Sequence, residues 1–347
     1  MELDLSSLAG KTLLITGGTG MIGKRMIDCL LERTDCRVIL LGRSEEKAHE
    51  RFAEPCWRDG RLSFVQWDPS HPTPLVNSNI PTFEHSNIPT FQHSNIDFIL
   101  HLASNTHPVA YATDPVGTVV MNVSAAKELL DLAVAKKARF VYASSVEIYG
   151  QNRGDCEKFS EDYCGYLDCN TLRAGYPESK RCGEALCQAY ARQHGVDVVI
   201  PRLARVYGPT LLRDDSKALS QFLHNALDGK DIVLKSEGKQ FFSYLHVDDA
   251  VSGLLTVMLR GKSGEAYNIA DGKSDIALRD LAALVADACG RKVVFDIPDA
   301  TESSGFSPAM VARLDNAKLV ALGWRAEYDI RAGVVSTIRM LQKSRAI

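Results

Sequence analysis

An apolar segment that runs directly into a glycine-rich turn constrains the fold of this chain more than any other feature. Lys11–Thr16 has the pattern of a buried strand, the turn Gly17-Gly18-Thr19-Gly20-Met21-Ile22-Gly23 follows at once, and a helix with one apolar stripe comes next. Glycines in this context let the backbone approach a pyrophosphate at the start of the helix. The segment predicts a dinucleotide-binding unit. Its G-x-x-G-x-x-G spacing differs from G-x-G-x-x-G, and an ordinary glycine turn is the alternative.

Strand-like and helix-like segments alternate after this unit. The expected strands are Arg37–Leu41, Leu62–Trp67, Asp97–Leu102, Arg139–Ser144 and Val196–Pro201, and the expected helices are Thr118–Val134 and Pro177–His194. This alternation predicts an α/β fold with a Rossmann-like, doubly wound parallel sheet. The pattern loosens after Tyr207-Gly208-Pro209. We therefore expect a Rossmann domain over residues 1–205, and over 206–347 mainly a smaller C-terminal substrate-binding lobe that closes over the carboxyl ends of the strands.

The end of the second expected strand bears on the choice between NAD and NADP. A carboxylate at this position would bind the ribose diol of NAD, but the chain has Gly42-Arg43-Ser44. A guanidinium and a hydroxyl are better partners for a 2′-phosphate, so Arg43 favours NADP; alternatively, it stacks on adenine or faces solvent. Asp68 ends the third strand, where it is placed to meet the adenine amino group. The predicted cofactor contacts from the glycine turn are Gly17, Gly20, Met21, Ile22 and Gly23.

The stretch from Val141 to Lys180 contains the residues that we expect to carry out the chemistry. Tyr176 precedes Lys180 by one helical turn, so the Lys180 ammonium can lower the pKa of the Tyr176 phenol. The Ser145 hydroxyl, at the end of an expected strand, can hydrogen-bond the same substrate oxygen. This trio suits removal of a proton from a sugar alcohol while a nicotinamide accepts the hydride. Tyr and Lys are common on helix faces, so the pair gains its meaning from the glycine turn that precedes it.

A tandem repeat interrupts the alternation between the third and fourth expected strands. Ser78–His85 is repeated almost unchanged as Ser86–His93, and Ser94-Asn95-Ile96 begins a third unit. Two units are too few for a solenoid, and the Pro and Asn content disfavours regular structure. We interpret residues 77–95 as a surface insertion without a role in the chemistry, with a lid or a partner-binding loop as the alternative.

Charge and cysteine content exclude several other classes of protein. The formal net charge of −3 gives no basic footprint for nucleic acid or for a membrane surface. The N-terminus is unlike a signal peptide, and the apolar runs are too short to span a membrane. The nine cysteines include no C-x-x-C pair, and the cluster Cys156, Cys164 and Cys169 lacks partners at zinc spacing. We expect no metal site and free thiols in a reducing, cytoplasmic setting.

Seven motifs in order resemble the extended short-chain dehydrogenase/reductase family, specifically its nucleotide-sugar epimerases, dehydratases and decarboxylases. These motifs are Gly17–Gly23, His101–Ser104, Ser145–Gly150, Tyr176–Lys180, Val206–Pro209, His246–Asp249 and Leu322–Trp324. The resemblance implies that Tyr176 is the acid/base, that Lys180 orients the cofactor ribose, and that Ser145 binds the substrate oxygen. It also places Leu102, Ala103, Ser104 and Asn122 at the cofactor, with Ser104 reaching the substrate as well. Such enzymes oxidise a sugar at C4, use the new carbonyl, and return the hydride.

The residues around Ser145 distinguish the branches of this family. Dehydratases of the family carry Thr-Asp-Glu where this chain has Ser145-Val146-Glu147, so the proton donor for a leaving hydroxyl is missing. Decarboxylases carry a hydroxyl residue, a spacer and Glu, which this chain matches, and Glu147 would steer protonation after carbon dioxide leaves. Arg173, three residues before Tyr176, is also similar to UDP-glucuronate decarboxylases, as are Leu102, Ala103, Ser104, Pro108, Tyr111, Asp114, Pro115 and Thr118. Alternatively, Glu147 caps a nearby helix or loop.

The chain departs from these relatives where they bind the substrate diphosphate. Relatives place an Arg in the run Gly238–Ser243, where this chain has Phe242, and Arg205 stands where they have a substrate-contacting Asn. Their late Arg-Arg-x-Pro element is also absent, and Phe306-Ser307-Pro308 lies in its place. Because a diphosphate in a closed cleft needs positive charge, we expect Arg205, with Arg202, to supply it.

The sequence predicts an enzyme that modifies a nucleotide-activated sugar through a transient 4-keto intermediate. Decarboxylation ranks ahead of 4-epimerisation, and 4,6-dehydration is third. An NADPH-dependent reductase with net cofactor turnover and a non-catalytic dinucleotide-binding module are the alternatives from other classes. Relatives pair through two helices per subunit, so we also expect a homodimer, with Ala125, Ala126, Leu129, Leu130, Ala185, Leu186 and Ala189 either at the interface or in the core.

Overall fold

The structure is a computed structural model that describes residues 3–69, 95–104, 106, 111, 113–296 and 310–345. The predicted repeat insertion lies outside the described residues except for Asn95, as do Pro108 and Phe306-Ser307-Pro308.

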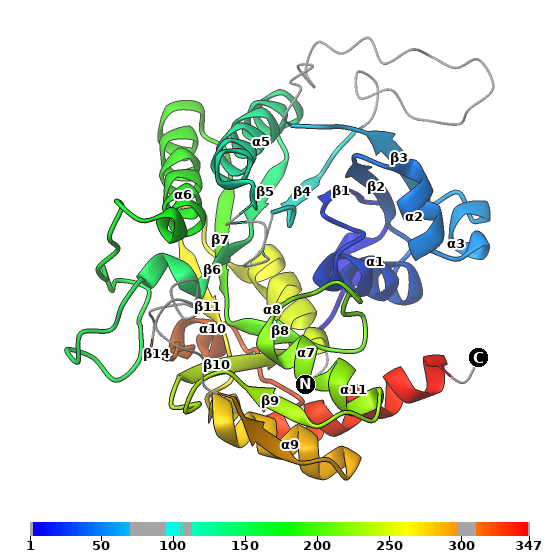
Figure 1. The fold of residues 1–347 in the computed structure, drawn as a ribbon. Helices are drawn as coiled ribbons and strands as arrows, with labels where there is room; N and C mark the ends of the chain where they lie inside the picture. Colours follow the sequence, from blue (N-terminus) through cyan, green and yellow to red (C-terminus); the bar gives the residue numbers. More distant parts are fainter. Residues whose placement is uncertain are drawn as a thin grey trace.

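The main sheet contains eight parallel strands in the described part of the chain, in the order β11-β7-β5-β4-β1-β2-β3 with β6 paired to β7 (Figure 1). The strands are β1 (Thr12–Thr16), β2 (Arg37–Gly42), β3 (Leu62–Gln66), β4 (Phe98–His101), β5 (Arg139–Tyr142), β6 (Ser144–Ser145), β7 (Val198–Leu203) and β11 (Ala266–Ile269). The chain runs outward from β1 to β3 and then returns to place β4 on the other side of β1. This reversal confirms the predicted Rossmann-like, doubly wound sheet, in which ligands bind at the carboxyl ends beside the switch point.

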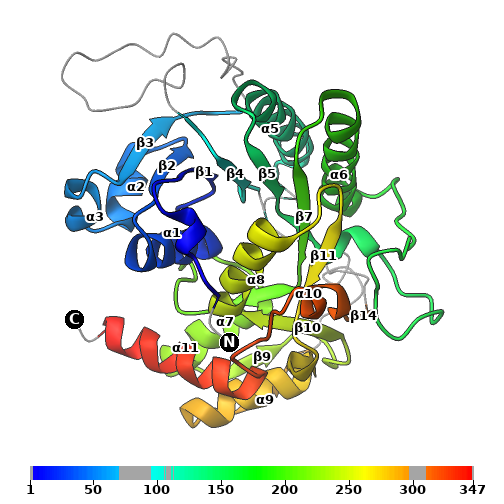
Figure 2. The same cartoon turned by 180° about the vertical axis from the view of Figure 1, so that it is seen from behind.

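The alternation of side chains along β1 explains why both faces of the sheet are covered. Leu13 and Ile15 belong to one buried apolar cluster, and Leu14 belongs to a second cluster on the opposite face. The first cluster includes residues of α1 (Met21–Arg33) and α8 (Val247–Arg260), whereas the second includes residues of α5 (Pro115–Lys136) and α6 (Gly175–His194). Figures 1 and 2 show α5 and α6 side by side on their face of the sheet.

A second sheet and a two-stranded sheet lie beside the carboxyl ends of the main sheet (Figure 1). The four strands of the second sheet are β8 (Arg205–Tyr207), β10 (Phe241–His246), β12 (Asp275–Ala277) and β14 (Val311–Ala312), and the pair is β9 (Ile232–Leu234) with β13 (Val293–Phe295). The remaining helices are α2 (Glu45–Arg51), α3 (Glu54–Arg58), α7 (Ala218–Leu227), α9 (Leu278–Cys289), α10 (Ala317–Ala321) and α11 (Ile330–Arg345). Short 3-10 turns occur at Ser6–Leu8, Val146–Tyr149, Leu172–Ala174 and Gly272–Ser274.

The C-terminal part of the chain is less separate than the predicted division at residue 205 implies. After β7, the chain passes from the main sheet into the second sheet, where β8 pairs with β10. However, β11 returns to the main sheet as its edge strand beside β7, and α8 packs against α1. Residues 247–269 therefore pack with the main sheet, although they follow residue 205 in the chain. No described helix is both long and apolar enough to cross a membrane.

Candidate active site

A cavity of about 1150 Å³ opens where the main-sheet strands end and the second sheet begins. Most of the residues predicted for the site line it: Gly17, Gly20, Met21, Ile22, Gly23, Arg43, Leu102, Ala103, Ser104, Ser145, Glu147, Arg173, Tyr176 and Arg205. Asp68, Asn122, Lys180 and Arg202 are not among the lining residues. The topology thus gathers side chains from nearly the whole chain at one edge of the sheet, as the carboxyl ends of parallel strands must.

The glycine turn forms a close-packed cradle at one end of the cavity. Gly17 has φ +70°, and a Cβ built there would lie 2.7 Å from the backbone nitrogen of Ala103. A Cβ on Gly23 would lie 2.3 Å from the Gly17 carbonyl oxygen, so α1 can approach β1 only because this residue is glycine. Gly20 is the N-cap of α1, with no side-chain cap and no acidic residue in the first turn. This exposed helix N-terminus fits the pyrophosphate of a dinucleotide.

The far end of this cradle is cationic in the described residues. Arg43, Ser44 and Lys47 line the cavity after β2, and the Lys47 backbone N–H donates to the Ser44 hydroxyl at 3.2 Å to begin α2. Sequence reasoning did not find Lys47, although its place in the first turn after the Arg43-Ser44 pair could have indicated it. Asp68 does not line the cavity, whereas its neighbours Trp67 and Pro69 do, so the structure does not place Asp68 at an adenine site.

Tyr176 and Ser145 both line the cavity, and burial has the largest effect on the pKa of the Tyr176 phenol. Burial raises the pKa of Tyr176 to about 12, although a hydrogen bond with the Ser145 hydroxyl opposes this rise. The Lys180 ammonium donates to the carbonyl oxygen of Ala143 at 2.9 Å, and burial lowers its pKa to about 8. The expected lowering of the Tyr176 pKa by Lys180 is therefore not seen. In this arrangement Lys180 ties α6 to the backbone just before Ser145.

Asn122 lies behind the cavity wall and connects three elements there. Its side-chain carbonyl accepts from the Ser104 hydroxyl at 2.8 Å, and its amide donates to the Ser179 hydroxyl, also at 2.8 Å. Ser179 in turn donates to the backbone carbonyl of Tyr176. Asn122 is only 1% exposed, which corrects its predicted contact with the cofactor: it positions Ser104 and Tyr176 instead.

Glu147, Arg173 and Arg205 form a charged cluster beside Ser145. The Glu147 carboxylate lies 2.9 Å from Nη2 of Arg173 and 3.7 Å from Nη2 of Arg205, and all three side chains line the cavity. The Arg173 guanidinium also lies over the ring of Tyr111, which stacks on Tyr176 with 5.0 Å between ring centroids. The alternative in which Glu147 caps a helix or loop is not seen, because its carboxylate pairs with these arginines.

Arg202 has a structural role, which corrects its predicted contact with the substrate. Its guanidinium pairs with both carboxylate oxygens of Glu184, at 3.0 and 2.7 Å, and donates to the Tyr149 hydroxyl and to the carbonyl of Glu161. Neighbouring residues on a strand point to opposite faces, so Arg202 and Leu203 cannot both face the cavity, and Leu203 lines it.

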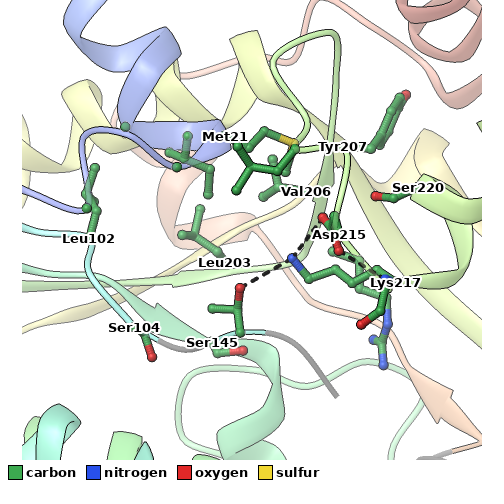
Figure 3. A pocket seen from close by; sticks show the side chains of 18 of the residues that line it. Met21, Leu102, Ser104, Ser145, Leu203, Val206, Tyr207, Asp215, Lys217 and Ser220 are labelled. Carbon is green, nitrogen blue, oxygen red and sulfur yellow. Dashed lines mark hydrogen bonds and ion pairs between the residues drawn. The ribbon is translucent and has the colours of Figure 1, made fainter. Parts of the chain in front are cut away.

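The opposite wall of the cavity is formed by the start of α7 (Figure 3). Lys217 precedes the helix, and its ammonium lies 3.5 Å from both the Thr106 hydroxyl and the Asp215 carboxylate. Ser220, in the first turn, is 6% exposed and lines the cavity. Figure 3 shows Lys217 extending toward the side that carries Ser145. No sequence motif indicated Lys217 or Ser220 as site residues, because both follow the point where the strand–helix alternation loosens.

Among the described residues, no group of three or more His, Cys, Asp or Glu side chains is arranged to hold a metal ion. The nine cysteines are all free thiols. The described residues that line the cavity supply hydroxyl, ammonium, guanidinium and carboxylate groups.

Comparison with known protein sequences identifies relatives over nearly the whole chain. A profile of the NAD dependent epimerase/dehydratase family matches residues 13–270. The chain is 28% identical to UDP-glucuronic acid decarboxylase 3 of Arabidopsis thaliana over 326 residues, which cover 93% of this chain and 86% of that protein. It is 27% identical to UDP-glucuronic acid decarboxylase 1 of Xenopus tropicalis over 340 residues, covering 98% and 74% of the two chains.

Solved structures show the same fold. A dTDP-glucose 4,6-dehydratase from Streptomyces venezuelae, solved with NAD bound, matches with a TM-score of 0.78 and 26% identity, covering 96% of this chain and 98% of that chain. The UDP-glucose 4-epimerase of Thermotoga maritima, solved with UDP-glucose, matches with a TM-score of 0.81 over 96% and 99% of the two chains, and its 20% identity shows the fold alone. With the glycine cradle and the Ser145–Tyr176–Lys180 arrangement, these matches show that the chain belongs to the NAD dependent epimerase/dehydratase family of nucleotide-sugar-modifying enzymes.

Proposed function

We propose that this enzyme decarboxylates a nucleotide-activated sugar acid of the UDP-glucuronate type through a transient 4-keto intermediate. The observation that carries the proposal is the place of Glu147, which lies in the cavity wall beside Ser145 and pairs with Arg173 at 2.9 Å. This arrangement supports the hydroxyl–spacer–Glu pattern of decarboxylases, and two of the relatives described above carry that activity in their names. The Asp that a dehydratase needs is Val146 in this chain.

Each residue has a defined task in this reaction. A nicotinamide dinucleotide in the glycine cradle supplies the hydride acceptor and, later, the hydride donor. Tyr176 takes the proton of the C4 hydroxyl, and Ser145 hydrogen-bonds the same oxygen as it becomes a carbonyl. The C6 carboxylate is then β to a ketone, so the C5–C6 bond breaks, carbon dioxide leaves, and the electron pair of that bond stays on the sugar as an enolate with the C4 carbonyl. Glu147 lies where it can direct the proton that returns to C5.

The nucleotide end of the substrate fits the α7 wall of the cavity. Lys217 brings positive charge to this wall, and the first turn of α7 contains no acidic residue. A helix N-terminus beside an ammonium suits a diphosphate. We therefore place the diphosphate near Lys217 and Ser220, with the sugar pointing toward Ser145 and Tyr176.

We propose NADP as the cofactor in preference to NAD. Arg43, Ser44 and Lys47 line the cavity after β2, and two cations with a hydroxyl suit a 2′-phosphate better than a ribose diol. Arg43→Ala should weaken NADP⁺ binding by about 10-fold or more and leave NAD⁺ binding nearly unchanged. Fluorescence titration of both dinucleotides tests this assignment, and equal losses for the two would reject it.

Product identification tests the proposed reaction. The purified enzyme is incubated with a panel of nucleotide sugars, including uronic acids, and the products are weighed by mass spectrometry while the cofactor absorbance is followed. The proposal expects loss of carbon dioxide from a uronate with no net change in the cofactor. An unchanged mass with a new sugar isomer would instead assign 4-epimerisation.

A reductase is the second candidate, because Arg43 and Lys47 favour the cofactor that reductases use. In that case the same assay would show stoichiometric conversion of NADPH. The Ser145–Tyr176 pair argues against a non-catalytic binding module, since such a module has no need of it.

We propose that the enzyme is a homodimer that pairs through α5 and α6. Ala125, Ala126, Leu129 and Leu130 of α5 belong to the core, so they cannot form the interface. Exposed apolar side chains nevertheless remain on α5: Val116, Val119, Val120 and Val134. Ala185 and Ala189 of α6 are exposed as well. Light scattering of Val120→Glu should show a monomer; an unchanged dimer would place the interface elsewhere.

A further inference from the structure

The cluster of Glu147, Arg173 and Arg205 has more positive charge than its own members neutralise. Two guanidinium groups share one carboxylate, and the three side chains are 25%, 25% and 23% exposed in the order Glu147, Arg173, Arg205. The Nη1 atoms of both arginines are buried and have no hydrogen-bond partner in the described part of the chain. Because an unmet charged donor is costly, this cluster is suited to receive a further anion from the cavity.

Arg205 extends from β8 and is held in place by an aromatic ring on the neighbouring strand β10. β8 and β10 are parallel, with Arg205 opposite Tyr244, so Phe242 lies two residues away on the same face of β10. The Arg205 guanidinium stacks on the Phe242 ring with 3.6 Å between Cζ and the ring centroid. Stacking fixes the plane of the guanidinium, which reduces the freedom that it would lose on binding a ligand.

The position of the cluster shows which part of the substrate it meets. Glu147 lies two residues after Ser145 in the 3-10 turn Val146–Tyr149, and its backbone N–H donates to the Ser145 hydroxyl at 3.2 Å. Arg173 lies three residues before Tyr176 and contacts it through the Tyr111 ring. The cluster therefore lies beside the Ser145–Tyr176 pair, where the proposed function places C4 of the sugar. It does not lie at the α7 wall, where the diphosphate is placed, so the expected role of Arg205 at the diphosphate is revised.

We propose that Arg173 and the Phe242-stacked Arg205 together bind the C6 carboxylate of the sugar and select acidic over neutral nucleotide sugars. In a hexuronate, C6 is two bonds from C4, so a sugar whose C4 hydroxyl meets Ser145 and Tyr176 presents its carboxylate to this cluster. Glu147 spaces the two arginines and keeps one net positive charge for the ligand. This proposal rests on the proposed function and adds the residues that bind the negatively charged carboxylate of the substrate.

The test compares two ligands that differ only at C6, UDP-glucuronic acid and UDP-glucose. Affinities are measured by calorimetry with saturating cofactor in a Tyr176→Phe background, so that neither sugar is converted. We expect the parent to prefer the acid and Arg205→Gln to reduce that preference about 10- to 100-fold, with UDP-glucose binding nearly unchanged. Arg205→Lys and Phe242→Leu should give intermediate preferences, because each keeps the charge but loses the stacked geometry.

Arg213→Gln is the matched control, since Arg213 is exposed and does not line the cavity. It removes the same charge and should leave the preference at the parent value. Equal losses of both ligands in Arg205→Gln would make Arg205 a diphosphate ligand and overturn the inference, while decarboxylation by the enzyme with Tyr176 intact would still support the proposed function. If the parent binds the two sugars equally, the inference fails; if it binds neither, the proposed function fails with it.

Discussion

Tyr176 illustrates how burial sets the chemistry of single residues in this site. Burial raises the pKa of Tyr176 to about 12 and lowers that of Lys180 to about 8. Both shifts disfavour charge at this buried position, and the Ser145 hydroxyl, followed by the Arg173 guanidinium, favours the Tyr176 phenolate. The residue types at these positions were predictable from the sequence. Their pKa shifts were not, because they depend on the burial that the folded cavity provides.

Replacement of Tyr176 by Phe tests its role as the acid/base. The change removes one hydroxyl and keeps the ring that stacks on Tyr111, so the fold should persist. We expect kcat to fall about 100- to 10,000-fold, while nucleotide-sugar affinity changes little. Steady-state rates combined with calorimetry measure both quantities. A variant that retains wild-type kcat would remove Tyr176 from the mechanism.

At the scale of elements, α5, α6 and the loop after β4 are joined by Asn122. Its hydrogen bonds to Ser104 and Ser179 cross from α5 to both partners and are shielded from solvent. Asn122→Ala leaves both hydroxyls without this partner and should lower the free energy of unfolding by about 1–3 kcal/mol. Urea denaturation measures this loss. We also expect a lower kcat, since Ser104 and Tyr176 lose their shared support.

A control variant distinguishes the loss of the Asn122 hydrogen bonds from the general effect of truncating a side chain on α5. The Lys127 side chain is 62% exposed on the same helix, in a surface pair with Asp131, so Lys127→Ala should leave the free energy of unfolding within about 0.5 kcal/mol of the wild type. If Asn122→Ala were equally harmless, the hydrogen bonds would not join these elements.

The sequence predicted the main-sheet strands of the first half of the chain and missed several strands of the second half. Buried parallel strands read as apolar runs, so β1 to β5 and β7 were found within one or two residues of their bounds. β11 was missed because a four-residue edge strand from residue 266 has no local signal that it returns to the main sheet. The same holds for the site residues. Most of those predicted from motifs line the cavity, whereas Lys47, Lys217 and Ser220 belong to no motif and could be assigned to the cavity only from the fold.

At the scale of the whole molecule, the C-terminal segment contacts two buried groups whose effects on stability change with pH in opposite directions, His246 at the end of β10 and Asp249 in α8. Burial lowers the pKa of His246 to about 4, and Asp249, which accepts from the backbone N–H groups of Glu327 and Tyr328, has its pKa raised by burial to about 6. The stability that His246 contributes is present above 6.5 and is lost as the pH falls toward 4. The contribution of Asp249 is full below 3.8 and is lost as the pH rises through 6.

These two effects oppose each other between about pH 4 and pH 6.5, so single substitutions should reveal each one. Relative to the wild type, His246→Asn should gain stability as the pH falls, and Asp249→Asn should lose it, each by up to about 3 kcal/mol across the range. Urea unfolding at several pH values measures the slopes. Parallel pH dependences in all three proteins would show that neither group titrates as described.

If the proposed reaction is correct, hydride leaves C4 of the sugar and returns to C4 within one turnover, and an isotope label at C4 reports this directly. The enzyme would be given UDP-glucuronic acid carrying deuterium at C4, and the product analysed by mass spectrometry and NMR. Our account predicts a decarboxylated product that retains the deuterium at C4, with no labelled cofactor released. Decarboxylated product without the label, or deuterium in free reduced cofactor, would contradict it.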